Sequence, residues 1–242
     1  MGKVFATVSG KGGTGKSTLC CTLGTSIAVL GNSVVIVDLD FGLRCQDIFF
    51  GIESDVVFDL SDALSTGNYD NSIYLSEVFR GVAVVPAPNT EGIKNKVDFL
   101  NFIDYLKMKY DYVFLDFPAG LDFSLLDGIP DLTCLCVSNS DPISVRDAYA
   151  VKSELKKIGI EPLLIINKFE AALMESRLHK NFDDIIDTSD IQLLGVIPYS
   201  KELSVFSVTH QISNRSKAKK AIKRIVNRIC GYYVPLPKPS KI

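Results

Sequence analysis

The sequence has no long apolar segment, no C-x-x-C pair and no group of histidines. No run among its 242 residues approaches the ~18 consecutive apolar residues that a membrane-spanning helix requires. The chain begins directly on an apolar strand pattern, which predicts that it has no signal peptide. Its six cysteines are typical of small buried hydrophobic residues in a reducing cytoplasm, rather than of disulfides or a metal site. We interpret the two histidines, His179 and His210, as incidental.

Charge is distributed unevenly along the chain. The apolar content of 47% and the charged content of 22% are ordinary for a globular protein. The length suits one large α/β domain, which we predict to span residues 1–231 before a proline-rich tail of residues 232–242. Residues 1–214 carry 17 basic and 28 acidic residues, a net charge of −11, whereas residues 215–242 carry 9 basic residues and no acid. This separation predicts that the basic segment meets an anionic surface.

A glycine-rich run at residues 9–18, S-G-K-G-G-T-G-K-S-T, contains the pattern G-x-x-x-x-G-K-[ST] between an apolar strand pattern and a helical one. Glycine lets the backbone approach phosphate oxygens closely, and the helix that starts near Gly15 directs its first N–H groups at the anion. Lys16 supplies positive charge, and the Ser17 hydroxyl is placed to bind Mg²⁺. The alternative is an accidental glycine-rich turn. The predicted nucleotide-binding residues here are Gly12, Gly13, Thr14, Gly15, Lys16, Ser17 and Thr18.

Carboxylates follow two predicted buried strands. Residues 34–37 are all β-branched and are followed by Asp38-Leu39-Asp40, and residues 112–115 are followed by Asp116. In parallel sheets, ligands bind beyond the carboxyl ends of the strands, so these acids are expected to face the phosphates. Without a cation, Asp38 and Asp40 would repel each other. The alternative for this pair is that it caps the next helix. Asp116, at the tip of an apolar strand pattern, stands where a carboxylate directed at Mg²⁺ belongs.

Strand and helix patterns alternate through the rest of the chain. Residues 132–137 and 162–166 are expected strands, and Asn167 follows the second. Its amide suits the adenine edge, although a turn asparagine is an equal alternative. Residues 91–109 are predicted to form an amphipathic helix with Val97, Leu100, Ile103, Leu106 and Met108 on its apolar face. The alternation predicts a doubly wound α/β fold: a mainly parallel sheet with helices on both faces.

Five motifs together resemble the MinD/ParA family of ATPases, whose phosphate loop is a deviant Walker A sequence. They are the loop at 9–18, D-L-D-F-G-L-R, D-F-P-A-G, S-V-R-D-A and L-L-G-V-I-P. The Gly42-Leu43-Arg44 continuation favours the MinD branch. The resemblance implies a slow Mg²⁺-dependent ATPase that binds ATP or ADP and forms a homodimer across ATP. It also implies a role in placing the division septum, with division-regulator partners of the MinC/MinE kind.

The same resemblance assigns roles to individual residues. Lys11 would act across the dimer on the nucleotide of the other subunit, with Lys16 serving its own. Asp38 would lie near Mg²⁺. Asp40 would orient the attacking water. The backbone N–H of Gly120 would sense the γ-phosphate, and Pro198 would lie along the adenine base. Phe117 stands where the family usually has a small residue, which affects the local packing of the switch.

The C-terminal segment departs from the MinD pattern, because the separate membrane-inserting helix at the end of those proteins is missing here. One hypothesis is that the helix predicted at 216–229 contacts an anionic membrane through an isoleucine stripe and basic residues. The alternative is that the stripe packs on the domain and the basic face is simply solvated. A ParA-like partition ATPase that binds DNA non-specifically, and a flagellar-number-type regulator with little hydrolysis, also stay open. The basic residues concerned are Lys217, Lys219, Lys220, Lys223 and Arg224.

Overall fold

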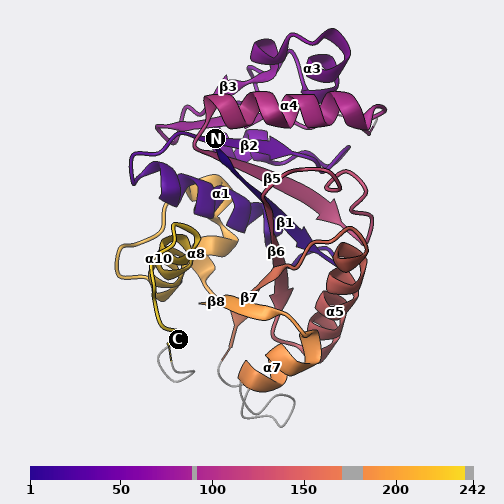
Figure 1. Ribbon diagram of the computed structural model, residues 1–242. Coiled ribbons are helices and arrows are strands. Elements are labelled where there is room, and N and C mark those ends of the chain that lie inside the picture. Colours follow the sequence, from indigo (N-terminus) through magenta and orange to yellow (C-terminus); the bar gives the residue numbers. More distant parts are fainter. Residues whose placement is uncertain (89–91, 171–181, 238–242) are drawn as a thin grey trace. The chain divides into compact units, whose positions relative to one another are not determined.

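A computed structural model of the chain describes residues 1–88, 92–170 and 182–237 (Figure 1). Glu91 and His179, on which predictions fell, and the last five residues of the predicted tail lie outside the described residues. The chain forms two compact units. The first comprises Met1–Thr7, Leu19–Pro118 and Phe123–Leu132, and the second comprises Val8–Thr18, Ala119–Asp122 and the residues from Thr133 onward. The single domain over residues 1–231 stays a prediction.

In the first unit the strands lie in the order β3-β4-β2-β5-β1. β2 pairs in parallel with β4 and with β5, while β3 is antiparallel to β4. The last residues of β1 and β5 and the first turn of α1 belong to the second unit. The strands are β1 (Lys3–Ser9), β2 (Val34–Asp38), β3 (Tyr74–Leu75), β4 (Val82–Val85) and β5 (Tyr112–Ala119). The helices are α1 (Lys16–Ala28), α2 (Gln46–Phe50), α3 (Leu60–Thr66), the 3₁₀ turn η1 (Tyr69–Ser72) and α4 (Lys96–Lys109).

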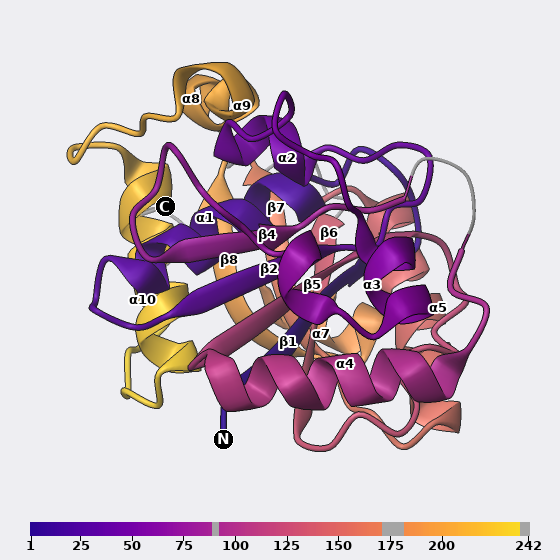
Figure 2. The same ribbon diagram turned by 90° about the horizontal axis from the view of Figure 1, so that it is seen from above.

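The centre of this unit is β2, which is buried along its whole length. Gly24 of α1 lies against the side chains of Val34 and Ile36, and its lack of a Cβ lets the helix approach the strand closely. In Figures 1 and 2, α1 and α4 lie on opposite sides of β2. A strand covered on both faces needs apolar residues at every position, which explains the unbroken β-branched run.

In the second unit, β7 pairs in parallel with both β6 and β8. α10 packs on β8, where the side chain of Ile225 lies directly over Gly195. Figures 1 and 2 show α5 and α10 on opposite sides of these strands. The strands are β6 (Leu132–Asn139), β7 (Leu163–Phe169) and β8 (Gln192–Pro198). The helices are α5 (Pro142–Lys157), α7 (Phe182–Ser189), α8 (Lys201–Ser204), α9 (Phe206–Thr209) and α10 (Lys217–Ile229).

The predicted fold class is confirmed. Among the described residues, eight strands form a mainly parallel sheet, and helices cover both faces of it in each unit. The short helices α2, α7, α8 and α9 were not predicted. Segments of four to eight residues carry too few turns for a helical period to stand out.

The prediction for α4 was partly wrong. The helix begins at Lys96, because the Asn95 side chain accepts a hydrogen bond from the N–H of Val97 and caps it there. Val97 and Met108, placed on the apolar face, are 62% and 74% exposed. Ile103 and Leu106 are buried as predicted, and Phe99, Phe102 and Lys107 are buried with them.

The isoleucine stripe of α10 is buried, as the packing alternative requires. Of its predicted members, Ala218, Ile222 and Ile225 are buried and Ile229 is half-buried, whereas Lys219, Lys220 and Lys223 are exposed. In this arrangement the stripe cannot also insert into a bilayer, so that half of the membrane hypothesis is wrong. Within the described residues, no helix has the length and apolar character to cross a membrane.

Candidate nucleotide-binding site

The glycine-rich loop joins β1 directly to α1. Gly13 and Gly15 have φ values of +77° and +92°, a region that other residues rarely adopt. The Ser9 hydroxyl donates to the Lys11 carbonyl at 2.7 Å, which closes the first part of the loop. Thr14 is buried, and among the described residues its hydroxyl has no hydrogen-bond partner. A buried hydroxyl without a partner is costly, and a phosphate oxygen would satisfy it.

β7 holds this loop from one side. The Asn167 side-chain N–H donates to the Thr14 carbonyl at 2.8 Å, and the Lys168 ammonium donates to the Gly13 carbonyl at 2.7 Å. A Cβ on Gly15 would collide with Asn167 Nδ2. Asn167 thus positions the phosphate loop, and its contact with adenine stays a prediction. Lys168, with a left-handed φ of +52°, was missed because no motif marks it.

Lys11 lies beside the start of α5. Its ammonium is 3.6 Å from Asp141 Oδ1, and Asp141 caps α5 by accepting from the Ser144 N–H and hydroxyl. Partial burial raises the pKa of Asp141, but the hydrogen bonds from Ser144 and the charge of Lys11 outweigh it, so the pKa lies below its usual value. Asp147 of the same helix lies against Gly10. The S-V-R-D-A segment therefore packs on the phosphate loop within the second unit.

Two further predicted residues lie at strand ends in this unit. The Gly120 N–H donates to the Ser9 carbonyl at 3.0 Å, and its φ is +141°. To contact a γ-phosphate, this N–H would have to leave Ser9, so the sensing role stays a prediction. Pro198 ends β8 opposite Phe169, two residues beyond Asn167 in β7. Its contact with adenine also stays a prediction.

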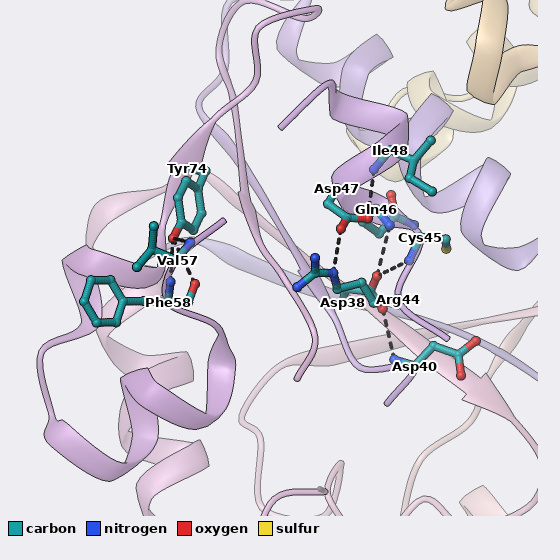
Figure 3. A network of polar contacts seen from close by, with 10 residues as sticks. All are labelled: Asp38, Asp40, Arg44, Cys45, Gln46, Asp47, Ile48, Val57, Phe58 and Tyr74. Atoms are coloured by element: carbon teal, nitrogen blue, oxygen red, sulfur yellow. Dashed lines mark hydrogen bonds and ion pairs between the residues drawn. The ribbon is translucent and has the colours of Figure 1, made fainter. Parts of the chain in front are cut away.

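The predicted carboxylates lie side by side in the first unit. Asp38 and Asp116 are register partners on β2 and β5, and neither is exposed. Asp38 Oδ1 accepts from the Asp40 N–H at 3.0 Å, and its Oδ2 accepts from the N–H groups of Cys45 and Gln46 at 2.9 and 3.0 Å (Figure 3). The helix-capping alternative is thus partly right, because Asp38 binds the first N–H of α2.

Burial and the adjacent charge of Asp116 raise the pKa of Asp38 to about 7, although three backbone N–H groups oppose the shift. The pair therefore needs a proton or a cation near neutral pH. Asp40 is only partly buried, and Figure 3 shows its carboxylate directed away from Asp38. That orientation leaves Asp40 available for a task other than sharing a metal with Asp38.

Mg²⁺ fits this donor set. It prefers oxygen ligands, and proteins commonly bind it with one or two carboxylates while substrate phosphates and water complete the shell. Across the part of the chain that the structure describes, no group of three or more His, Cys, Asp or Glu side chains could hold a metal by itself. A site that takes its remaining ligands from a nucleotide agrees with both observations.

Comparison with known proteins identifies the family. Residues 5–213 match the CobQ/CobB/MinD/ParA nucleotide binding domain. The chain belongs to this family. It is 32% identical to the septum site-determining protein MinD of Bacillus subtilis over 256 aligned positions, which cover 98% of this chain and 92% of that protein. The predicted membership of the MinD branch, and with it a P-loop ATPase of the MinD type, is confirmed.

Solved structures of MinD proteins share the fold. A MinC:MinD cell division protein complex of Aquifex aeolicus matches with a TM-score of 0.86 and 26% identity, covering 98% of each chain. MinD of Pyrococcus horikoshii in complex with Mg-ADP matches with a TM-score of 0.79 and 25% identity, covering 96% of this chain and 97% of that one. In this MinD-type chain, the residues predicted from the loop motif lie on one continuous segment, formed by β1, the loop and α1.

Proposed function

We propose that this chain is an ATP-driven dimerisation switch of the MinD type that helps to place the division septum. The observation that carries the proposal is the phosphate loop. Gly13 and Gly15 of the loop have positive φ, and side chains of β7 donate hydrogen bonds to two of its carbonyls. The Thr14 hydroxyl is buried without a hydrogen-bond partner among the described residues, and a phosphate oxygen could accept from it. MinD relatives that match nearly the whole chain support the cellular role.

The chemistry that we propose is hydrolysis of ATP to ADP and phosphate. The loop N–H groups and Lys16 would bind the phosphates, and Ser17, Asp38 and Asp116 would hold Mg²⁺. When bound, Mg²⁺ neutralises charge on the phosphates. Asp40 would orient the attacking water. A partly buried carboxylate is a weak base, so turnover should be slow.

Lys11 is the residue that we propose to act in the second subunit of the dimer. In this structure its ammonium is paired with Asp141, and the side chain is 36% exposed. An exposed ion pair contributes ~1 kcal/mol or less, so Lys11 can leave Asp141 at little cost. A triphosphate of the partner subunit carries more negative charge than the single carboxylate of Asp141, so it attracts the Lys11 ammonium more strongly. The lysine can thus exchange one anionic partner for another when two ATP-bound chains meet.

We expect ATP to double the mass of the wild-type protein in solution, whereas Lys11→Ala should stay at 26.6 kDa with ATP or ADP. The reason is that the triphosphates at a dimer interface would repel each other without Lys11. Light scattering after gel filtration measures the mass. Lys96→Ala is a matched control, because Lys96 is also a 38%-exposed lysine in a surface ion pair. An equal mass for all proteins with ADP and ATP would contradict the switch.

A division regulator of the MinC kind is the partner that we propose. The MinC:MinD complex of Aquifex aeolicus supports it, because the chain shares the fold of that MinD over 98% of its length. A homodimer presents two copies of each surface, so ATP-dependent assembly would give such a partner a bivalent site. Pull-down with and without ATP tests this step.

We infer that α10 contacts anionic surfaces by charge alone, since its apolar stripe is buried. Wild type with ATP should sediment with anionic vesicles at low salt, and Lys219/Lys220/Lys223→Glu should not. High salt should also release wild type, because exposed charges are screened. Equal sedimentation of both proteins would contradict this inference. Tighter, salt-dependent binding to DNA than to vesicles would instead favour the ParA-like function.

A further inference from the structure

Asp38 and Asp116 are held in place by groups other than a metal. Asp38 is the last residue of β2, whereas β5 continues past Asp116 to Ala119. Neither side chain has exposed surface, so neither acid can turn toward water to escape the other. The Thr7 hydroxyl donates to Asp116 Oδ1 at 3.2 Å. Backbone N–H groups from residues 40, 45 and 46 donate to Asp38. Two buried carboxylates in adjacent registers need such donors, because burial of an unpaired charge is costly.

Gln46 contacts both acids at once. Its backbone N–H donates to Asp38 Oδ2 at 3.0 Å, and its side-chain Nε2 donates to Asp116 Oδ2 at 2.7 Å. The residue is completely buried. A single neutral residue therefore connects the carboxylate of Asp38, at the end of β2, to the carboxylate of Asp116, inside β5.

The position of Gln46 is itself fixed. It is the first residue of α2, and the Arg44 guanidinium binds Asp47, which is 3% exposed, at 2.6 Å (Figure 3). At the other end of α2, the Phe50 side chain is buried and its carbonyl accepts from the Ser76 hydroxyl at 3.1 Å. Because both ends of this short helix are anchored, the Gln46 amide cannot drift away from the acids.

We propose that Gln46 is the positioning residue of the magnesium site, setting the affinity for Mg²⁺ by holding Asp38 and Asp116 in register. This inference rests on the proposed nucleotide function. Removal of a group that hydrogen-bonds to a metal-binding carboxylate, and so orients it, typically lowers metal affinity by about 10- to 100-fold. Gln46 does this with a side chain that no motif of the sequence marks as functional.

The test replaces Gln46 by methionine, which keeps its length but cannot donate a hydrogen bond. A fluorescent ADP analogue is titrated first in EDTA and then, at saturating analogue, with increasing MgCl₂. We expect Gln46→Met to bind the analogue in EDTA as wild type does, and to need about 10-fold more Mg²⁺ for half of the metal-dependent signal. Gln192→Met is the control, because Gln192 is exposed at the start of β8.

A second variant keeps the test decisive if Gln46→Met does not fold. Gln46→Leu also cannot donate a hydrogen bond and adds no charge beside the two acids, so its Mg²⁺ midpoint should rise at least as much. A purely structural role would lower the melting temperature and leave the Mg²⁺ midpoint unchanged, which would overturn the proposal. If wild type bound no analogue with or without Mg²⁺, both the proposed function and this inference would fail. Normal Mg²⁺ coupling in every variant would overturn the inference alone.

Discussion

Alanine in place of Gly15 is expected to weaken binding of ADP and ATP by about 100-fold or more. The new Cβ would collide with Asn167 Nδ2, whose hydrogen bond to the Thr14 carbonyl holds the loop in place. The φ of +92° is also unfavourable for alanine by roughly 1–2 kcal/mol. A displacement of about 1 Å in a site of this kind can cost two orders of magnitude. Titration calorimetry with Mg-ADP measures the loss.

Gly31 supplies a matched control. It has the same φ of +92°, but a Cβ there would meet nothing within 4 Å. Gly31→Ala should therefore lower the melting temperature through backbone strain while leaving nucleotide affinity unchanged. Full affinity in Gly15→Ala would show that the contact between the loop and β7 does not shape the site.

Asp116→Asn should weaken the stabilisation of the protein by magnesium and nucleotide. Without metal at pH 8, the variant should melt several degrees above wild type, because one of two adjacent buried charges is gone. With Mg-ADP, wild type should gain far more stability than the variant, since ligand binding to the native state stabilises it. The amide can still accept from one neighbour and donate to another. Thermal melts in EDTA and in Mg-ADP measure both effects.

The pH dependence follows from the pKa of Asp38. Because the pKa is raised to about 7 in the folded protein, the native state holds a proton between about pH 4 and pH 7 that the unfolded state has lost. Stability of the metal-free wild type should therefore be highest near pH 4 with respect to this group and fall as pH rises through 7. Three pKa units correspond to about 4 kcal/mol.

In Asp116→Asn this fall should be smaller but not absent, because burial is the larger cause of the shift and remains. Asp187→Asn on the surface of α7 is the control and should follow the wild-type profile. A profile for Asp116→Asn identical to that of wild type would mean that the two acids do not interact.

Local sequence was sufficient for much of the fold. Unbroken β-branched runs such as β2 indicate strands covered on both faces, and alternation with helices leaves a parallel sheet as the simplest arrangement. The α4 face was harder to predict, because Lys107 is buried while Met108 is exposed. Amphipathic patterns record average polarity, whereas a long lysine stem can pack along an apolar surface.

The residues of the candidate site also fall into two groups, those that local motifs predict and those that only the tertiary structure reveals. Motif spacing was enough to select the loop glycines, Lys16, Asp38 and Asp116. The predicted strand end at Asp116 was wrong, because β5 continues to Ala119. Lys168 and Gln46 could not be selected, because each acts on a partner far away in the sequence: Gly13 for one and Asp116 for the other. A residue whose role depends on such a contact carries no local pattern.

The sequence by itself determined the family, the phosphate loop and the acids of β2 and β5, since these depend on neighbours along the chain. Only the tertiary structure decided that Asn167 positions the loop, that Lys11 pairs with Asp141, and that the stripe of α10 is buried on β8. The physical reason is that hydrogen bonds and burial depend on distances in space. The folded chain brings residues 14 and 167, or 46 and 116, within 3 Å of each other.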